Sequence, residues 1–238
     1  MHRFFTNEIH EHTAVVRGED VKHISRVLRL RAGDCVQLCD GQGNECGAVI
    51  ESVAPDAVTF QTQPWTKAES EPNAAVTLFQ CLPKAGKMET IIQKCVELGA
   101  AGFVPVQSER CVVVLKPPYE GRIERWQRVS EEAAKQSRRG RIPAVELPKT
   151  LKELDFSDFD TVLAAYENER TVSLKTALKA HPCRNIAIII GPEGGFSGEE
   201  IAILTGKGAS TVSLGTRILR TETAGMAMLA QIMYEVEP

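Results

Sequence analysis

Short runs of alternating apolar and polar residues dominate the first 70 positions and predict β-strands. The alternation is clearest at residues 13–17, 34–40, 46–53 and 57–63. Turn-forming residues separate these runs, above all at residues 40–44 with their two glycines. One helical pattern interrupts the strands at about residues 19–28, with an apolar face of Val21, Ile24, Val27 and Leu28. Together the patterns predict a small β-barrel-like module.

The pattern changes after residue 73 to an alternation of buried-strand runs and amphipathic helices. Strands are expected at residues 74–82, 103–106, 161–165, 186–190 and 211–214, and helices at about 88–98, 123–133, 197–207 and 222–236. Repeated strand–helix units predict an α/β fold with a mostly parallel sheet. The polar stretch at residues 63–73 carries two prolines and is expected to link a first domain, residues 1–72, to a second, residues 73–238.

Composition and charge restrict the classes of protein to consider. Hydrophobic residues make up 43% and charged residues 25% of the chain, which excludes a disordered or fibrous protein. No apolar run approaches the roughly 18 residues of a membrane span, and the first residues form no apolar leader. Seven scattered cysteines without a CxxC motif predict free thiols, no metal site and a cytoplasmic location. The net charge of −3 means that a nucleic-acid partner would need a local basic patch.

The loop after the expected strand 186–190 is rich in glycine. It reads Gly191-Pro192-Glu193-Gly194-Gly195-Phe196, and glycines let a backbone approach a ligand closely. Ser197 and Glu200 have the spacing of a capping box, which predicts the start of a helix. Ligands bind at the carboxyl ends of parallel strands, so this loop is a candidate site. A simple glycine-rich turn into a capped helix fits the same residues.

A second loop follows the expected strand 211–214 and contains Arg217 and Arg220. Thr221 is expected to cap the last helix, and Glu222 to complement its dipole. Two arginines beside a helix start suit an anionic ligand or a carboxylate, although pairing with nearby acids would explain them equally simply. The chain has neither the G-x-G-x-x-G nor the G-x-x-x-x-G-K-[ST] fingerprint in a strand-to-helix turn, which disfavours a Rossmann enzyme.

Taken in order, residues 190–197 and 214–224 closely resemble the bacterial 16S ribosomal RNA uridine-1498 N3-methyltransferases. These belong to the SPOUT superfamily of knotted, S-adenosylmethionine-dependent enzymes. Further matches lie at residues 3–5, 23–34, 94–99, 108–110 and 132–137, so the resemblance covers the whole chain. Two departures are Cys111, where members often have serine, and Arg138, where many have glycine.

This resemblance implies an N-terminal PUA-like RNA-binding domain and a C-terminal α/β domain with a deep trefoil knot. It also implies a homodimer that acts on 16S ribosomal RNA in the small ribosomal subunit. The cofactor, S-adenosylmethionine, would lie bent in the knot and be held largely by backbone groups. The residues that the resemblance places around the cofactor are Leu163, Gly191, Pro192, Glu193, Gly194, Gly195, Leu214, Gly215, Ile218, Leu219 and Arg220.

The chemistry of uracil methylation indicates what catalysis requires. The N3 proton must leave before or during methyl transfer, so the site needs a base or a cation that stabilises the imide anion. Among the residues of the second loop, Arg220 is the candidate for the cationic role and Glu222 a weaker candidate for a polar partner. Glu193 would stabilise the sulfonium of the cofactor or form a structural salt bridge; the sequence leaves both open.

Basic residues gather in places despite the negative net charge. Those expected to contact RNA are Arg3, Lys22, Arg26, Arg29, Arg31, Arg138 and Arg139. The leading interpretation is therefore an RNA methyltransferase. The alternative is a catalytically silent RNA-binding ribosome-assembly protein with the same fold, and a SPOUT enzyme acting on transfer RNA fits the N-terminal matches less well.

Overall fold

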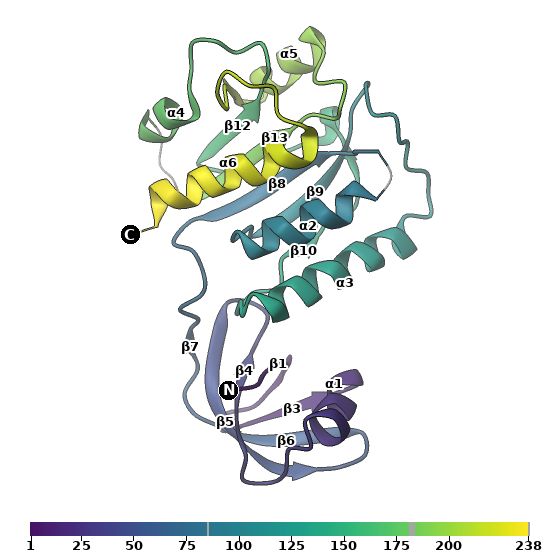
Figure 1. Cartoon of the computed structure of the whole chain (residues 1–238), viewed down its shortest axis with the longest axis vertical. Helices are drawn as coiled ribbons and strands as arrows, with labels where there is room; N and C mark the ends of the chain where they lie inside the picture. The colour runs from purple at the N-terminus through teal and green to yellow at the C-terminus, as the bar shows by residue number, and fades with distance from the viewer. Residues whose placement is uncertain (85, 181–183, 238) are drawn as a thin grey trace. The chain divides into compact units, whose positions relative to one another are not determined.

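The structure is a computed structural model that describes residues 1–84, 86–180 and 184–237 of the chain (Figure 1). Its residues form two compact units. Unit 1 comprises Met1–Glu71 together with Ala134–Ile142, and unit 2 comprises Pro72–Ala133 with Pro143–Pro238. The first division lies next to the expected boundary at residue 72. The return of residues 134–142 to unit 1 is a feature that the linear division into two domains did not include.

Unit 1 is built on a curled sheet in which most neighbouring strands are antiparallel. Its strands are β1 (Arg3–Phe5), β2 (Glu8–Ile9), β3 (Thr13–Arg17), β4 (Cys35–Cys39), β5 (Asn44–Val53), β6 (Ala57–Thr62) and β7 (Thr66–Lys67). They follow the order β1-β4-β5-β6-β3-β2, with β7 paired to β5 and β1 parallel to β4. Val36, Leu38, Ile50 and Phe60 point into one core, because alternate residues of a strand face the same side. The strands expected at residues 13–63 are confirmed.

The helix expected at residues 19–28 differs from an ordinary α-helix. A short α-helix, α1 (Glu19–Lys22), continues into the π-helix η1 (His23–Val27). A π-turn contains more residues than an α-turn and therefore shifts the phase of every later side chain. Val21 and Ile24 are buried as expected, but Val27 is 67% exposed. The prediction that Val27 belongs to the apolar face is wrong for this reason.

The stretch expected to be a linker is tied into unit 1. β7 pairs with β5, and the nearby carboxylate of Glu71 accepts hydrogen bonds from the Arg139 guanidinium and from the amides of Gly140 and Arg141. The Arg139–Glu71 ion pair measures 2.7 Å and both side chains are buried. Removing one member of a buried ion pair typically costs about 3–5 kcal/mol. This pair therefore fastens residues 134–142 to unit 1.

Unit 2 is an α/β unit with a fully parallel described sheet. Its strands are β8 (Ala75–Cys81), β9 (Gly102–Gln107), β10 (Ala144–Val145), β11 (Lys149–Thr150), β12 (Thr161–Ala165), β13 (Asn185–Ile190) and β14 (Ser210–Val212). They lie in the order β10-β9-β8-β13-β12-β14, with β11 paired to β9. Each of these pairings is parallel. The predicted α/β class with a mostly parallel sheet is confirmed.

The helices of unit 2 follow the predicted alternation with one addition. They are α2 (Lys87–Glu97), α3 (Glu120–Gln136), α4 (Leu174–Ala180), α5 (Gly198–Gly206) and α6 (Thr221–Val236), with a 3-10 turn at Leu151–Glu153. α2 and α6 pack side by side, and α6 also contacts β13 and β8 (Figure 1). The short helix α4 was not expected, although the Ser173 side chain accepts a bond from the Thr176 amide at its start. In the part of the chain that is described, no helix is long and apolar enough to cross a membrane.

Candidate functional site

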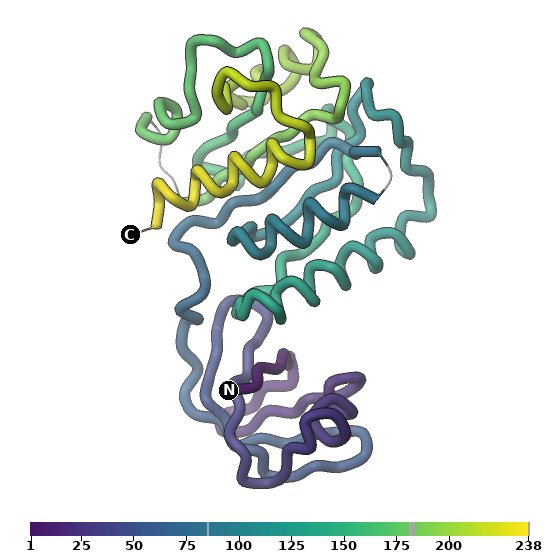
Figure 2. Tube along the Cα trace, viewed as in Figure 1, coloured from purple at the N-terminus to yellow at the C-terminus, as the bar shows by residue number. Residues whose placement is uncertain are grey.

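A cavity of about 460 Å³ lies in unit 2 where the chain leaves strands β12, β13 and β14. Three segments line it: residues 165–167 with Arg170, residues 190–195, and residues 213–221. Lys87 of α2 and Ala224 of α6 complete the lining. The segment from β13 to α5 can be followed in Figure 2. The cavity therefore occupies the carboxyl ends of neighbouring parallel strands, where α/β proteins bind ligands.

The glycines of the first loop are closely surrounded by neighbouring side chains. Gly195 has a φ of +64°, and a Cβ built on it would lie 2.1 Å from Oε1 of Glu167. A Cβ on Gly194 would lie 3.2 Å from Arg110, and one on Gly191 would lie 3.2 Å from the Phe196 ring. A Cβ at Gly195 would push the exposed Glu167 carboxylate aside, and the positive φ strains any other residue at this position.

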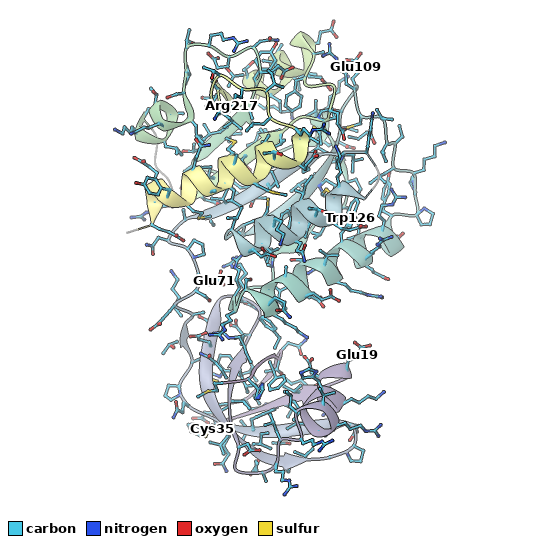
Figure 3. All side chains as sticks on the ribbon, viewed as in Figure 1. Glu19, Cys35, Glu71, Glu109, Trp126 and Arg217 are labelled. Carbon is cyan, nitrogen blue, oxygen red and sulfur yellow. The ribbon has the colours of Figure 1, made fainter. Side chains whose placement is uncertain are left out.

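A neighbouring segment holds this loop in place. The Arg110 guanidinium donates to the carbonyl oxygen of Gly194 at 3.0 Å. The amide of Glu109 donates to Oε1 of Glu200 at 2.7 Å, while Oε2 of Glu200 accepts from the Ser197 amide. The expected capping box of Ser197 and Glu200 is confirmed. The buried Glu200 thus serves two segments, and Figure 3 marks the position of Glu109.

Cys111, one of the departures from the family pattern, lies just after this segment. Its sulfur receives hydrogen bonds from the thiol of Cys81 and from the Ser108 amide. The bond from Cys81 and those from Ser108 outweigh the effect of burial and lower the pKa of Cys111 to about 6. Cys111 therefore lies beside the ends of β8 and β9, outside the lining of the cavity.

The second loop joins the first through Thr221. The Thr221 hydroxyl donates to the carbonyl oxygen of Gly191 at 2.6 Å and accepts a bond from the Gln80 amide at 2.9 Å. Thr221 lies inside α6 and Arg220 is the N-cap residue, without a side-chain capping bond. The prediction that Thr221 caps this helix is therefore wrong. Its hydroxyl instead fixes the two loops to each other.

Lys87 is the charged centre of one cavity wall. Its Nζ lies 3.0 Å from Oε1 of Glu193 and 3.0 Å from Oε2 of Glu222. The hydrogen bonds to Glu193 and Glu222 raise the pKa of Lys87. Burial alone would raise the pKa of Glu193 and of Glu222, but hydrogen bonds, including those from Lys87, outweigh it and lower both. Of the two roles left open for Glu193, the structure places it in a salt bridge.

The structure brings most of the predicted cofactor residues together. Residues 191–195 line the cavity, as do Leu214, Gly215, Ile218, Leu219 and Arg220. Leu163 does not line it: this side chain is fully buried in β12, and the cavity begins at Ala165, nearer the strand end. Glu222 also lies outside the lining and reaches the wall through Lys87.

Several lining residues were absent from the sequence prediction. They are Lys87, Ala165, Tyr166, Glu167, Arg170, Ser213, Thr221 and Ala224. Tyr166, Glu167 and Arg170 follow β12, and their position after a buried strand was the available signal. Lys87 had no comparable signal, because it precedes its partners by more than 100 residues.

The two arginines of the second loop are exposed at the cavity. Neither Arg217 nor Arg220 forms an ion pair within 4.0 Å among the described residues, although the charge of Arg220 lies near enough to Glu222 to help lower the pKa of that carboxyl. Figure 3 marks Arg217 in the loop that leads to α6. The cavity thus combines exposed guanidinium groups, backbone from glycines and the apolar side chains of Leu214, Ile218 and Leu219.

The residues expected to contact RNA divide into exposed and buried groups within unit 1. Lys22, Arg26, Arg29, Arg31 and Arg138 are exposed. Arg3 is mostly buried, with an ion pair of 2.7 Å to Glu45 and a bond to the carbonyl oxygen of Arg138. Arg139 is 3% exposed and paired with Glu71. The expectation that Arg3 and Arg139 offer their charges to RNA is corrected, because both guanidinium groups are already paired inside the unit.

Among residues 1–84, 86–180 and 184–237, no group of three or more His, Cys, Asp or Glu side chains could hold a metal ion. The cysteines in those ranges are free, and Cys183 lies outside them.

Comparisons with known proteins agree with this geometry. Residues 69–233 match the model of an RNA methyltransferase domain, and residues 16–63 match that of an RNA methyltransferase PUA domain. The ribosomal RNA small subunit methyltransferase E of Bacillus subtilis is 36% identical over 94% of this chain and 91% of its own. The protein of that name from Synechocystis is also 36% identical, over 94% of this chain and 74% of its own.

A solved structure extends the likeness to three dimensions. The ribosomal RNA small subunit methyltransferase E of Neisseria gonorrhoeae, bound to S-adenosyl methionine, is 30% identical. It superposes with a TM-score of 0.84 over 99% of this chain and 98% of its own.

Proposed function

Because the chain belongs to the ribosomal RNA small subunit methyltransferase E family of RNA methyltransferases, we propose that it methylates N3 of uridine 1498 in 16S ribosomal RNA, with S-adenosylmethionine as the methyl donor. The single observation that carries the proposal is the cavity at the carboxyl ends of β12, β13 and β14. Most of its lining comes from the two loops whose sequences carry the family resemblance. The proposal also includes a cytoplasmic homodimer and a trefoil knot, which rest on family membership alone.

The cavity residues fit the proposed cofactor. The exposed backbone of Gly194 and Gly195 allows close approach, and the apolar side chains of Leu214 and Leu219 suit an adenine ring. The cofactor supplies an electrophilic methyl group on a positively charged sulfur. Glu193 is already paired with Lys87, whereas Glu167 has no ion pair within 4.0 Å among the described residues. Glu167 is therefore the carboxylate available to a positive group of the cofactor.

Arg220 is the residue that we assign to stabilise the uracil. Loss of the N3 proton puts negative charge on the imide, and an exposed guanidinium in a fixed position stabilises such charge. Arg220 lines the cavity beside the Thr221 bond that fixes its backbone. Glu222 is paired with Lys87 and its pKa is lowered, so it is a weak base. Its role in this proposal is to hold Lys87 and the start of α6.

Methylation of isolated small ribosomal subunits tests the activity itself. Subunits from a strain that lacks this protein would be incubated with the full chain and S-adenosylmethionine, and modified nucleotides would be mapped. We expect one new N3-methyluridine, at position 1498. Methylation at another nucleotide would overturn the target. Cofactor binding without any methylation would favour the silent RNA-binding protein instead.

Substitution of Arg220 tests the mechanism. We expect Arg220→Ala to reduce single-turnover methylation by roughly 10²–10³, as loss of one preorganised donor does. Arg220→Lys should recover only part of the rate, because lysine keeps the charge without the planar fork. Arg184→Ala, an exposed arginine of the same unit, is the control. Normal turnover in Arg220→Ala, or a defect confined to cofactor affinity or melting temperature, would exclude the catalytic role.

A further inference from the structure

A second depression in unit 2, the α2–α3 groove, lies between the start of α2, residue Val113 and the start of α3. Its volume is about 560 Å³. Lys84, Arg122 and Arg125 contribute three cationic side chains, and Glu89 contributes the single carboxylate. No residue of the groove lines the cavity of the proposed active site, so the two are separate features.

The charges of the groove are largely available to a ligand. Arg125 pairs with Glu89 at 3.0 Å, yet 70% of the Arg125 side chain remains exposed. Lys84 and Arg122 are exposed, and neither forms an ion pair within 4.0 Å in the described ranges. The net charge of the groove is therefore positive, and it suits an anionic partner.

The floor of the groove is apolar. Leu82, Met88 and Trp126 lie beneath it and are nearly fully buried, and Val113 forms a half-buried edge. Figure 3 marks Trp126 on α3. A groove lined by basic side chains follows the backbone of single-stranded nucleic acid, whose phosphates meet the cations. The buried Trp126 supports this floor and leaves no ring face for a base to stack on.

The groove and the proposed active site share a wall. The amide of Lys84 donates to Oε1 of Glu193 in the glycine loop at 3.1 Å. Lys87 lines the cavity, whereas Lys84 and Met88 line the groove. The two features are therefore adjacent where α2 begins.

We propose that the α2–α3 groove binds the single-stranded RNA segment that flanks the methylated nucleotide. This inference rests on the proposed function. Access to N3 requires that the target uridine be unpaired, because N3 lies on the pairing edge of the base. Holding the flanking segment in a separate basic groove keeps the target unpaired and sets which neighbouring nucleotides are accepted. Lys84 and Arg122 are positioning residues that contact phosphates.

Charge reversal on either side of the groove tests the proposal. The full chain would be titrated with a fluorescently labelled 12-nucleotide single-stranded RNA at several salt concentrations. We expect Arg122→Glu and Lys84→Glu each to weaken binding about fivefold at low salt and to reduce the salt slope by about 0.7, the value for one phosphate contact on single strands. Lys179→Glu, an equal charge change at an exposed position of α4, should leave both unchanged.

The remaining measurements separate the possible outcomes. Calorimetry with S-adenosylmethionine should give wild-type affinity for both groove variants, because neither side chain lines the cavity. If Arg122→Glu and Lys84→Glu had the same RNA affinity and salt slope as Lys179→Glu, the groove assignment would be overturned. The proposed function would still stand if the wild-type chain methylated small ribosomal subunits. A change of sedimentation from dimer to monomer in Arg122→Glu would overturn the groove assignment as well, by assigning the groove to a second copy of the chain.

Discussion

Gly195 is the position at which the cavity leaves least freedom for substitution. Its positive φ strains any residue other than glycine, and a side chain there would displace the Glu167 carboxylate. We expect Gly195→Val to abolish S-adenosylmethionine binding in calorimetry, because a β-branched residue is strained at this positive φ and its side chain would displace Glu167 at the cavity. The protein should remain folded, since the change lies at a cavity surface.

Gly206→Val is the matched control for this prediction. A Cβ at Gly206, the last residue of α5, meets nothing within 4 Å and the backbone there has no positive φ. This variant should bind the cofactor normally. If Gly195→Val were folded and kept wild-type affinity, the cavity would not be the cofactor site.

Single residues also mark the limit of prediction from local patterns. The glycines of residues 191–195 were predicted to line a site because a glycine-rich loop directly follows a buried strand. Lys87 was missed because its role depends on Glu193 and Glu222, which approach it only in the folded chain. Arg139 was expected to contact RNA because it lies in a run of basic residues. Such a run does not reveal that Arg139 pairs inside the protein with Glu71, 68 positions earlier.

At the level of elements, the turn between β12 and α4 carries Tyr166, Glu167 and Arg170 to the cavity. Glu169 holds this turn: it accepts bonds from the hydroxyl and the amide of Thr171, and from the Thr211 hydroxyl of β14. The bonds from Thr171, followed by that from Thr211, lower the pKa of Glu169 to about 2. The carboxylate is thus more strongly favoured in the folded chain than in the unfolded one.

This depressed pKa gives stability a defined pH dependence. The contribution of Glu169 is fully present above the unfolded pKa near 4.5 and disappears as the pH falls through about 2. We expect Glu169→Gln to lower the melting temperature at pH 7, and the difference from the wild type to shrink between pH 4.5 and 2. Glu124→Gln, an exposed carboxylate on α3, should show no such pattern. If the difference in melting temperature between Glu169→Gln and the wild type did not change with pH, the Glu169 charge would not have this role.

Elements with a long, regular pattern were predicted well, and short or irregular ones were not. β3 has the expected bounds because its residues alternate with a period of two, and β12 because it is one continuous buried run. The π-turn of η1 changes the period within a single helix, so a pattern read at 3.6 residues per turn places Val27 on the wrong side. β10 and β11 contain two residues each, too few to show any period.

For the whole molecule, the basic residues on unit 1 provide a second place at which RNA affinity can be tested. Lys22, Arg26, Arg29 and Arg31 are exposed, and none forms an ion pair within 4.0 Å in the described ranges. We expect Arg26→Glu to weaken binding of small ribosomal subunits and to lower the salt dependence, because one phosphate contact is lost. Cofactor affinity should not change. The control is Lys67→Glu, which makes the same change of charge at an exposed residue of β7. If Arg26→Glu and Lys67→Glu bound small ribosomal subunits equally well, Arg26 would be ordinary solvated surface.

The return of residues 134–142 to unit 1 has a consequence for how such a chain can evolve. The backbone passes from one unit to the other three times, after Glu71, Ala133 and Ile142. A gene fusion or exchange at any single one of these points would separate Glu71 from Arg139 or leave part of a unit behind. Unit 1 therefore cannot be acquired or replaced intact by one recombination event. Lineages that carry it are therefore expected to inherit both units together, as one gene of nearly constant architecture.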